Sequence, residues 1–279
     1  MIRFVPAAIL ATATLAAGAA SAAEIFTPPN GFWLDPVKYN HTLYGPTDSF
    51  ATWHATQWQS PGPALPAFAN GLTASSNQRV VWSGSSWEMA LNGHNLACGV
   101  EFGGFFEPNI ASTYAGYPAA GGNSAPLSSM ISLHHRLGVT YKYYAVVDNT
   151  CTNQGNFLTS FVLKNTVDKS SLYYQIAMVY LNSANPNPWP NGYWWEVANQ
   201  NNWGFSDGIQ HYGGVPPALG HRAYYDIDLL PRIKQIIAMS TLPDKNLSHW
   251  VVNSNYHGVH VWGHITATAD FDSFSLDQE

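Results

Sequence analysis

Apolar and polar positions alternate over many short stretches of the chain. Gly, Pro, Asn and Ser separate these stretches at short intervals, while Val, Tyr, Phe and Thr are common within them. Successive side chains of a β-strand point to opposite faces, so alternation indicates strands with one buried face. The pattern therefore predicts many antiparallel strands, among them residues 78–84, 85–93, 139–148, 157–165, 173–182 and 265–276.

One stretch has the apolar spacing of a helix. In DIDLLPRIKQIIAMS, residues 226–240, the apolar side chains recur at helical spacing and fall near one face, namely Ile227, Leu230, Ile233, Ile236 and Ile237. Pro231 then lies in the first turn, where its missing N–H costs little.

The organisation indicated is a single domain. We find no internal repeat and no dividing linker, although residues 182–192 and 213–220 form substantial Pro- and Gly-rich loops. We expect residues 23–279 to form one all-β domain, a two-sheet antiparallel β-sandwich or jelly roll with one short helix.

The first residues have the pattern of a secretory signal peptide. Arg3 is followed by an apolar stretch and by the small residues Ala20-Ser21-Ala22, so we exclude residues 1–22 from the fold. No later segment approaches the roughly 20 consecutive apolar residues of a membrane helix. We expect a soluble, secreted protein, extracellular or periplasmic, that is a monomer and has no membrane partner.

Composition limits the kinds of partner. Charged residues are 10% of the chain and aromatic residues 14%, with 11 Trp, 15 Tyr and a net charge of −6. Nucleic acid requires clustered Lys and Arg, so we expect no nucleic-acid partner. Exposed Trp and Tyr rings suit uncharged sugar rings, although an aromatic-rich core also accounts for many of them.

Cys98 and Cys151 are the two cysteines of the chain. An even pair in an exported protein predicts a disulfide. Closing a loop of roughly 50 residues would stabilise the fold by about 4 kcal/mol in the chain-entropy model. Two buried free thiols are the alternative.

The segment YHGVHVWGH, residues 256–264, holds three histidines. On a strand, His260, Trp262 and His264 share one face and His257 points to the other. His260 and His264 are then roughly 13 Å apart, too far to ligate one Zn²⁺. We expect no metal and no cofactor here, while a site built with distant partners stays open, such as His134, His211 or His221.

The order of elements resembles the family-12 glycoside hydrolases. The matching segments are YNHTLYG (39–45), YYQIAMVYL (173–181), NPWPNG (187–192), YWWEV (193–197), YYDIDLLPRI (224–233) and HGVHVWG (257–263). Members of that family are secreted jelly-roll enzymes that cut β-glucans such as cellulose and xyloglucan. The resemblance implies that Gln175 stands at the position of the nucleophile and His260 at that of the acid/base.

Both of these positions depart from the family pattern. A retaining glycosidase needs two carboxyl groups about 5–5.5 Å apart. An amide is a poor nucleophile, so the ordinary double displacement should be unavailable. His260 remains a reasonable acid/base, since imidazole titrates near neutral pH, and a hydrogen bond from His260 to a sugar hydroxyl is the simpler alternative.

Several acids lie in aromatic-rich segments where a carboxylate is unusual, namely Glu88, Glu101, Glu107, Glu196 and Asp207. Buried carboxyl groups cost free energy unless they are paired or protonated. Glu101 and Glu196 are the candidates to support catalysis, and Glu101 is the first choice because nearby glycines allow a ligand to approach the backbone. The candidate sugar-stacking rings are Tyr44, Trp194, Trp195, Tyr256 and Trp262.

Two short motifs carry less weight. Residues 204–208, GFSDG, match a nucleophile elbow but lie in an Asn-rich loop of a β-dominated chain rather than in an α/β sheet. Asn40 and Asn246 fit the N-glycosylation pattern, which short triplets meet by chance.

The favoured hypothesis is a secreted glycan-active protein that binds, and in one version hydrolyses, a β-glucan-like polysaccharide or oligosaccharide. One alternative is a glutamic-type peptidase, with Gln175 acting beside Glu101 or Glu196. Another is a non-catalytic interaction protein. A lyase that uses His260 with a tyrosine needs cations for an acidic polymer, and the chain offers few, Arg79, Arg136, Arg222 and Lys142 among them.

Overall fold

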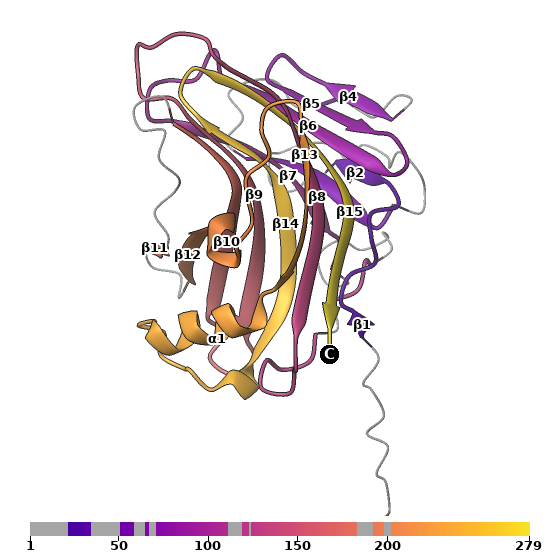
Figure 1. The fold of residues 1–279 in the computed structure, drawn as a ribbon, viewed down its shortest axis with the longest axis vertical. Coiled ribbons are helices and arrows are strands. Elements are labelled where there is room, and N and C mark those ends of the chain that lie inside the picture. The colour runs from indigo at the N-terminus through magenta and orange to yellow at the C-terminus, as the bar shows by residue number, and fades with distance from the viewer. Residues whose placement is uncertain are drawn as a thin grey trace, which may run out of the picture.

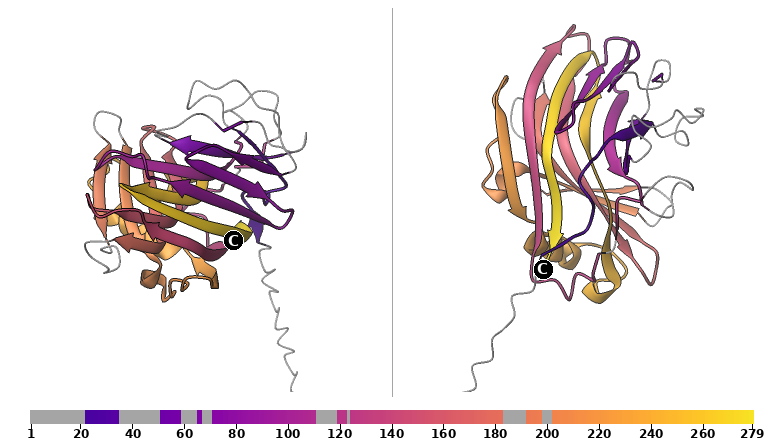
Figure 2. Two further views of the ribbon diagram at one scale, coloured as in Figure 1. Left: turned by 90° about the horizontal axis from the view of Figure 1, so that it is seen from above. Right: turned by 90° about the vertical axis from the view of Figure 1, so that its right-hand side faces the viewer.

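The computed structural model describes residues 22–34, 51–58, 65–66, 71–110, 119–122, 124–182, 192–197 and 202–279. The expected signal peptide therefore lies almost wholly outside the described residues. Figures 1 and 2 show long, curved strands stacked in two layers.

The first layer, within the described residues, is a seven-stranded sheet. Its order is β13 (Arg222–Asp228), β8 (Leu133–Val146), β15 (Ile265–Gln278), β6 (Ser86–Asn92), β5 (Gln78–Trp82) and β4 (Leu72–Ala74), with β1 (Ala23–Glu24) paired to β15. The second layer is an eight-stranded sheet in the order β11 (Tyr193–Val197), β12 (Asn202–Gly208), β10 (Ser171–Asn182), β9 (Gln154–Asn165), β14 (Trp250–Trp262), β7 (Glu101–Pro108), β3 (Trp53–Trp58) and β2 (Phe32–Leu34).

The expected β-sandwich with one short α-helix is confirmed. Every run predicted as a strand lies within or largely overlaps an observed strand. Most neighbouring strands are antiparallel, but β10 runs parallel to β12 and β2 runs parallel to β3. The sheets are therefore predominantly, not wholly, antiparallel.

The core lies between the two sheets. Phe106 of the eight-stranded sheet meets Phe271 of the seven-stranded sheet, with ring centroids 6.1 Å apart. Burial of a large apolar side chain contributes roughly 1.5–3 kcal/mol. His257 is also in this layer, where its Nε2 accepts a hydrogen bond of 2.7 Å from Trp87 Nε1. Burial holds the pKa of His257 well below its ordinary value, so the imidazole is a neutral acceptor.

The helix starts later than predicted. α1 spans Leu230–Met239 with Pro231 in its first turn, and it buries Leu230, Ile233, Ile236 and Ile237 as expected. Ile227 instead belongs to β13, where it lies opposite His135 of β8 in the strand register. No helix among the described residues has the length and apolar character needed to cross a membrane.

The predicted disulfide is not formed. Cys98 and Cys151 are free thiols, but Cys98 is exposed and Cys151 partly exposed, so the alternative of two buried thiols is also wrong. Their sulfur atoms lie within 4.8 Å of each other. A disulfide requires an S–S distance of about 2.05 Å. The two turns that carry the cysteines are thus adjacent without being cross-linked.

Candidate functional site

The two sheets present chemically different outer faces. On the seven-stranded sheet, the face away from the core carries ion pairs, including Arg79–Glu88, Lys142–Asp270 and Arg222–Asp272. On the eight-stranded sheet, Phe102, Phe161 and Val259 are buried and point into the core. Because side chains alternate along a strand, the residues next to them belong to the outer face. It carries mainly amides, hydroxyls and rings, and it contains the predicted site residues that the structure describes.

A row of polar side chains crosses this outer face. Gln175 of β10 lies opposite Ser206 of β12 on one side and Ser160 of β9 on the other, and Ser160 lies opposite Tyr256 of β14. Ser206 Oγ donates to Gln175 Oε1 at 3.3 Å, and Gln175 Nε2 donates to Tyr256 Oη at 3.0 Å. The amide of Gln175 is therefore fixed in orientation and positions the tyrosine hydroxyl.

The Tyr256 hydroxyl keeps its own proton. Burial raises the pKa of Tyr256, while the hydroxyl of Ser160 and the amide of Gln175, which lie beside the phenol oxygen, act in the opposite direction. Phe105 supports the ring edge-on, with centroids 5.1 Å apart. Because the oxygen accepts the hydrogen bond from Gln175, its O–H remains a donor.

A second group lies further along β14, where Glu101, His260 and Trp262 meet. His260 Nε2 is 3.5 Å from Glu101 Oε2, and the rings of His260 and Trp262 have centroids 4.0 Å apart. Burial lowers the pKa of His260 to about 3, so the ring is neutral near neutral pH. Burial raises the pKa of Glu101, partly offset by a hydrogen bond with Trp262.

Gln175 and His260 lie on the same outer face but in different rows. Gln175 is aligned through Ser160 with Tyr256, whereas His260 is aligned with Asn156 of β9. Four residues along β14 correspond to roughly 13 Å. Gln175 thus contacts Ser206 and Tyr256, whereas His260 lies beside Glu101.

The two acids whose side chains are described on this face, Glu101 and Glu107, do not form a glycosidase pair. Glu101 and Glu107 both stand on β7, and six residues of a strand correspond to about 20 Å. Glycosidases need carboxyl groups about 5–5.5 Å apart for retention or 6.5–9.5 Å for inversion. Gln175 and Glu101 are similarly separated along the strands, so Glu101 does not complete a peptidase-type pair with Gln175.

The remaining predicted site residues lie outside the described side chains. Tyr44 falls between the described ranges. Trp194, Trp195 and Glu196 are on β11, where the backbone pairs with Phe205, Gly204 and Trp203 of β12, respectively. Their roles stay predictions.

Two of the acids that the sequence places in aromatic-rich segments, Glu88 and Asp207, form ion pairs. Glu88 pairs with Arg79 at 2.9 Å and with Lys142 at 2.6 Å. Asp207, fully buried, is held by the guanidinium of Arg232 at 2.8 Å and 2.9 Å. Asp207 and Ser206 lie within β12 and not in a loop as expected, so the GFSDG segment has no strand-to-helix elbow at its serine.

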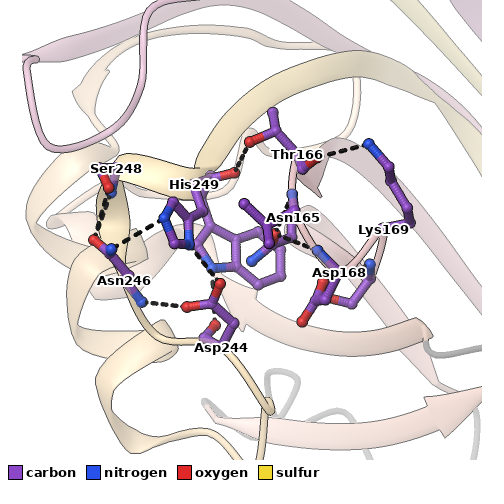
Figure 3. Close-up of polar contacts among 11 residues, drawn as sticks. Asn165, Thr166, Asp168, Lys169, Asp244, Asn246, Ser248 and His249 are labelled. Atoms are coloured by element: carbon purple, nitrogen blue, oxygen red, sulfur yellow. Dashed lines mark hydrogen bonds and ion pairs between the residues drawn. The ribbon is translucent and has the colours of Figure 1, made fainter.

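A separate polar cluster lies at the α1 end of the sandwich. Figure 3 shows Asp244 and Asn246, from the connection between α1 and β14, close to His249 and to residues of the β9–β10 turn. His249 Nδ1 is 2.6 Å from Asp244 Oδ2, and this contact lowers the pKa of Asp244 to about 2. Thr166 of the turn donates to the His249 carbonyl at 3.0 Å. These contacts link the α1–β14 connection to the β9–β10 turn, so the cluster has a structural role.

The two glycosylation triplets differ in what the structure describes. Asn40 lies outside the described residues. Asn246 is exposed, and its side-chain oxygen accepts from the Ser248 N–H at 3.1 Å while its Nδ2 lies 3.2 Å from His249 Nε2. Glycosylation of Asn246 stays a prediction.

Sequence reasoning missed Ser160, considered Ser206 only as part of the GFSDG motif, and considered Glu107 only as an acid in an aromatic-rich segment. Each lies in or beside the row that contains Gln175 and Tyr256, because strand register places it there. No local motif marks Ser160, since the row combines residues of four strands, β12, β10, β9 and β14.

Comparison with known proteins supports the fold. No protein-family model matches the chain, and no curated protein matches it. A native family 12 xyloglucanase from Bacillus licheniformis is similar in structure, with 13% identity, 81% of this chain and 100% of that chain covered, and a TM-score of 0.51. The family 12 xyloglucanase from the same organism in complex with ligand gives 12% identity, 81% and 99% coverage, and a TM-score of 0.50. The chain therefore has a jelly-roll fold of the family-12 type.

Proposed function

We propose that this protein binds a neutral β-linked glycan on the outer face of the eight-stranded sheet and does not cleave it by a two-carboxylate mechanism. The observation that carries the proposal is the hydrogen-bonded row of Ser206, Gln175 and Tyr256 at the place where the family-12 resemblance puts the nucleophile. Export from the cell, inferred from residues 1–22, is part of the same proposal.

The side chains of this face suit a sugar. Hydroxyl and amide groups recognise sugar hydroxyls, and the apolar face of a pyranose packs on an aromatic ring. Tyr256 supplies a hydrogen-bond donor and Trp262 supplies a ring, roughly 20 Å apart along β14. That separation favours a chain of several sugar units over a monosaccharide.

Charge favours a neutral glycan over an acidic one. The four cations considered for an acidic polymer lie on the other sheet, and each is paired with a carboxylate: Arg79 with Glu88, Arg136 with Asp226, Lys142 with Glu88, and Arg222 with Asp272. They are therefore poorly placed to neutralise a uronic-acid chain on the eight-stranded sheet.

The chemistry of the row argues against conventional hydrolysis. Gln175 has an amide in place of a nucleophilic carboxylate, and its two polar atoms are engaged by Ser206 and Tyr256. Burial raises the pKa of Glu101, which favours its protonated form relative to an exposed glutamate. The other described acid of this face, Glu107, is about 20 Å from Glu101 along β7, which is beyond the distance that either glycosidase mechanism requires.

Isothermal titration with soluble xyloglucan and mixed-linkage β-glucan oligosaccharides tests binding. Trp262→Ala should weaken binding at least tenfold, which corresponds to about 1.4 kcal/mol. Tyr256→Phe should weaken it about fivefold, since one hydrogen bond contributes about 1 kcal/mol. Tyr143→Ala is the matched control, because Tyr143 is 50% exposed and lies on the other sheet.

Two results would contradict the proposal. Absence of heat with every neutral glycan would remove the binding function. Release of reducing sugar that Glu101→Gln abolishes would show that the face is catalytic after all.

A further inference from the structure

Three turns converge at the end of the sandwich opposite α1. Cys98 lies in the connection between β6 and β7, Cys151 in the turn between β8 and β9, and His264 in the turn between β14 and β15. Figure 1 shows the last two turns together at the upper end of the molecule, far from α1. One ligand atom from each of the three residues lies within 4.8 Å of the others.

We propose that Cys98, Cys151 and His264 form a binding site for a zinc-class divalent cation. Two thiolates and an imidazole are the donors that Zn²⁺ prefers, with Zn–S distances of about 2.3 Å and Zn–N distances of about 2.0–2.1 Å. Donors around a tetrahedral ion at those distances lie roughly 3.5–4 Å apart. The observed spacing needs only small side-chain rotations to reach that geometry.

The histidine already has the contacts that orient a metal ligand. His264 Nδ1 lies 2.8 Å from the carboxylate of Asp148, and Nε2 lies 2.7 Å from the Leu96 carbonyl. A metal-bound histidine usually donates its second N–H to a carboxylate or a carbonyl. Metal uptake replaces one of these two contacts, and the other holds the ring in place.

The backbone permits the close approach. Gly263 has a φ of +73°, and a Cβ at that position would lie 3.2 Å from Cys151 Sγ and 2.8 Å from Asn153 Oδ1. Glycine therefore provides both the left-handed turn and the space for the thiol beside it. Three protein donors leave a fourth position for water or for the Asp148 carboxylate.

The site adjoins the proposed glycan-binding face without depending on it. Cys98 is three residues before Glu101, and His264 is two residues after Trp262. A bound cation would link the end of β7 to the end of β14, next to Glu101 and Trp262. Its expected role is therefore to order this end of the sheet, and it can be tested without any glycan.

The full-length chain, reduced and freed of metal, is titrated with Zn²⁺ alone and separately with Co²⁺. One ion per chain is expected, with thiolate-to-cobalt charge-transfer absorption for Co²⁺. Cys98→Ser, Cys151→Ser and His264→Asn should each weaken binding at least tenfold. Asp148→Asn should weaken it about 10–100-fold if the carboxylate orients the ring.

His94→Asn is the matched control, because His94 is exposed and lies on the same β6–β7 connection as Cys98. Its affinity for Zn²⁺ should equal that of the parent. Circular dichroism of each variant confirms that the β-sandwich is retained, and Cys→Ala variants replace any Cys→Ser variant that unfolds.

Three outcomes would overturn the proposal. One is no uptake of Zn²⁺ by the reduced chain at micromolar free metal. Another is uptake that the cysteine variants leave unchanged. The third is a Cys98–Cys151 disulfide, seen as a mass loss of two hydrogens, in protein purified with zinc present, because zinc-bound thiolates would resist that oxidation.

Discussion

At the scale of single residues, a buried carboxylate needs a charged or hydrogen-bonding partner to offset the cost of burial. The sequence indicated that acids within aromatic strands need partners, and Asp207 illustrates the rule. Its carboxylate is fully buried and receives hydrogen bonds from Arg232 of α1 and from Tyr174 of β10. The identity of the partner could not be predicted, because Arg232 is 25 positions away and approaches only when α1 packs beside β12.

Replacing Arg232 tests how much the Arg232–Asp207 pair contributes to the free energy of unfolding. Arg232→Met should lower the free energy of unfolding by about 3–5 kcal/mol, because it leaves an uncompensated buried carboxylate. Urea denaturation at neutral pH measures the change. Arg222→Met is the control, since Arg222 and Asp272 form a partly exposed pair with side chains 45% and 20% accessible, and a loss below about 1 kcal/mol is expected. Equal losses in the two variants would refute this account.

At the scale of elements, apolar periodicity located the strands and the helix but left their ends undecided. The helix face of Leu230, Ile233, Ile236 and Ile237 is buried as predicted. Its start shifts past Ile227 because Asp228 Oδ1 accepts from the N–H of Leu230 at 3.0 Å and from the N–H of Leu133 at 3.0 Å. The Asp228 carboxylate thus lies at the end of β13 and accepts a hydrogen bond from the first backbone N–H of α1.

Truncations on opposite sides of α1 should differ in effect. Ile236→Ala should cost about 2–5 kcal/mol, because the side chain is fully buried and its removal leaves a cavity. Met239→Ala, at a position 54% exposed, should change the free energy of unfolding by less than about 0.5 kcal/mol. Chemical denaturation of both variants measures the difference, and comparable losses would show that α1 does not dock through this face.

At the scale of the whole molecule, buried histidines couple the stability of the sandwich to pH. Burial lowers the pKa of His135 and of His260 to about 3, and that of His257 well below its ordinary value. In each case the folded-state pKa lies below that of the unfolded chain, near 6.5. The unfolded state therefore binds protons that the folded state does not, and stability falls as pH falls through this window.

His135→Phe should reduce this pH dependence. His135 packs edge-on against Phe161, so a phenyl ring suits the site. Between about pH 6 and pH 3.5, the slope of unfolding free energy against pH should be smaller by about 1.4 kcal/mol per pH unit. Leu137→Ala on the same strand is the control, since it should lower stability without changing the slope. Identical slopes for the parent and His135→Phe would contradict the prediction.

The sequence by itself determined the fold class, the position of the helix and which side chains share a face of a strand. His257 and His260 point to opposite faces because side-chain direction in a strand has a period of two, a local property. The buried face of α1 likewise follows from the local spacing of its apolar residues. These features follow from spacing along one segment and need no knowledge of neighbours.

Only the tertiary structure decided what each polar side chain meets. Gln175 bonds Tyr256 rather than pairing with His260, because strand register aligns residues 81 positions apart. The three turns that gather Cys98, Cys151 and His264 meet because β7, β9 and β14 are neighbours in one sheet. Register and strand order depend on the packing of the entire core, so contacts between distant segments cannot be inferred from the spacing within any one of them.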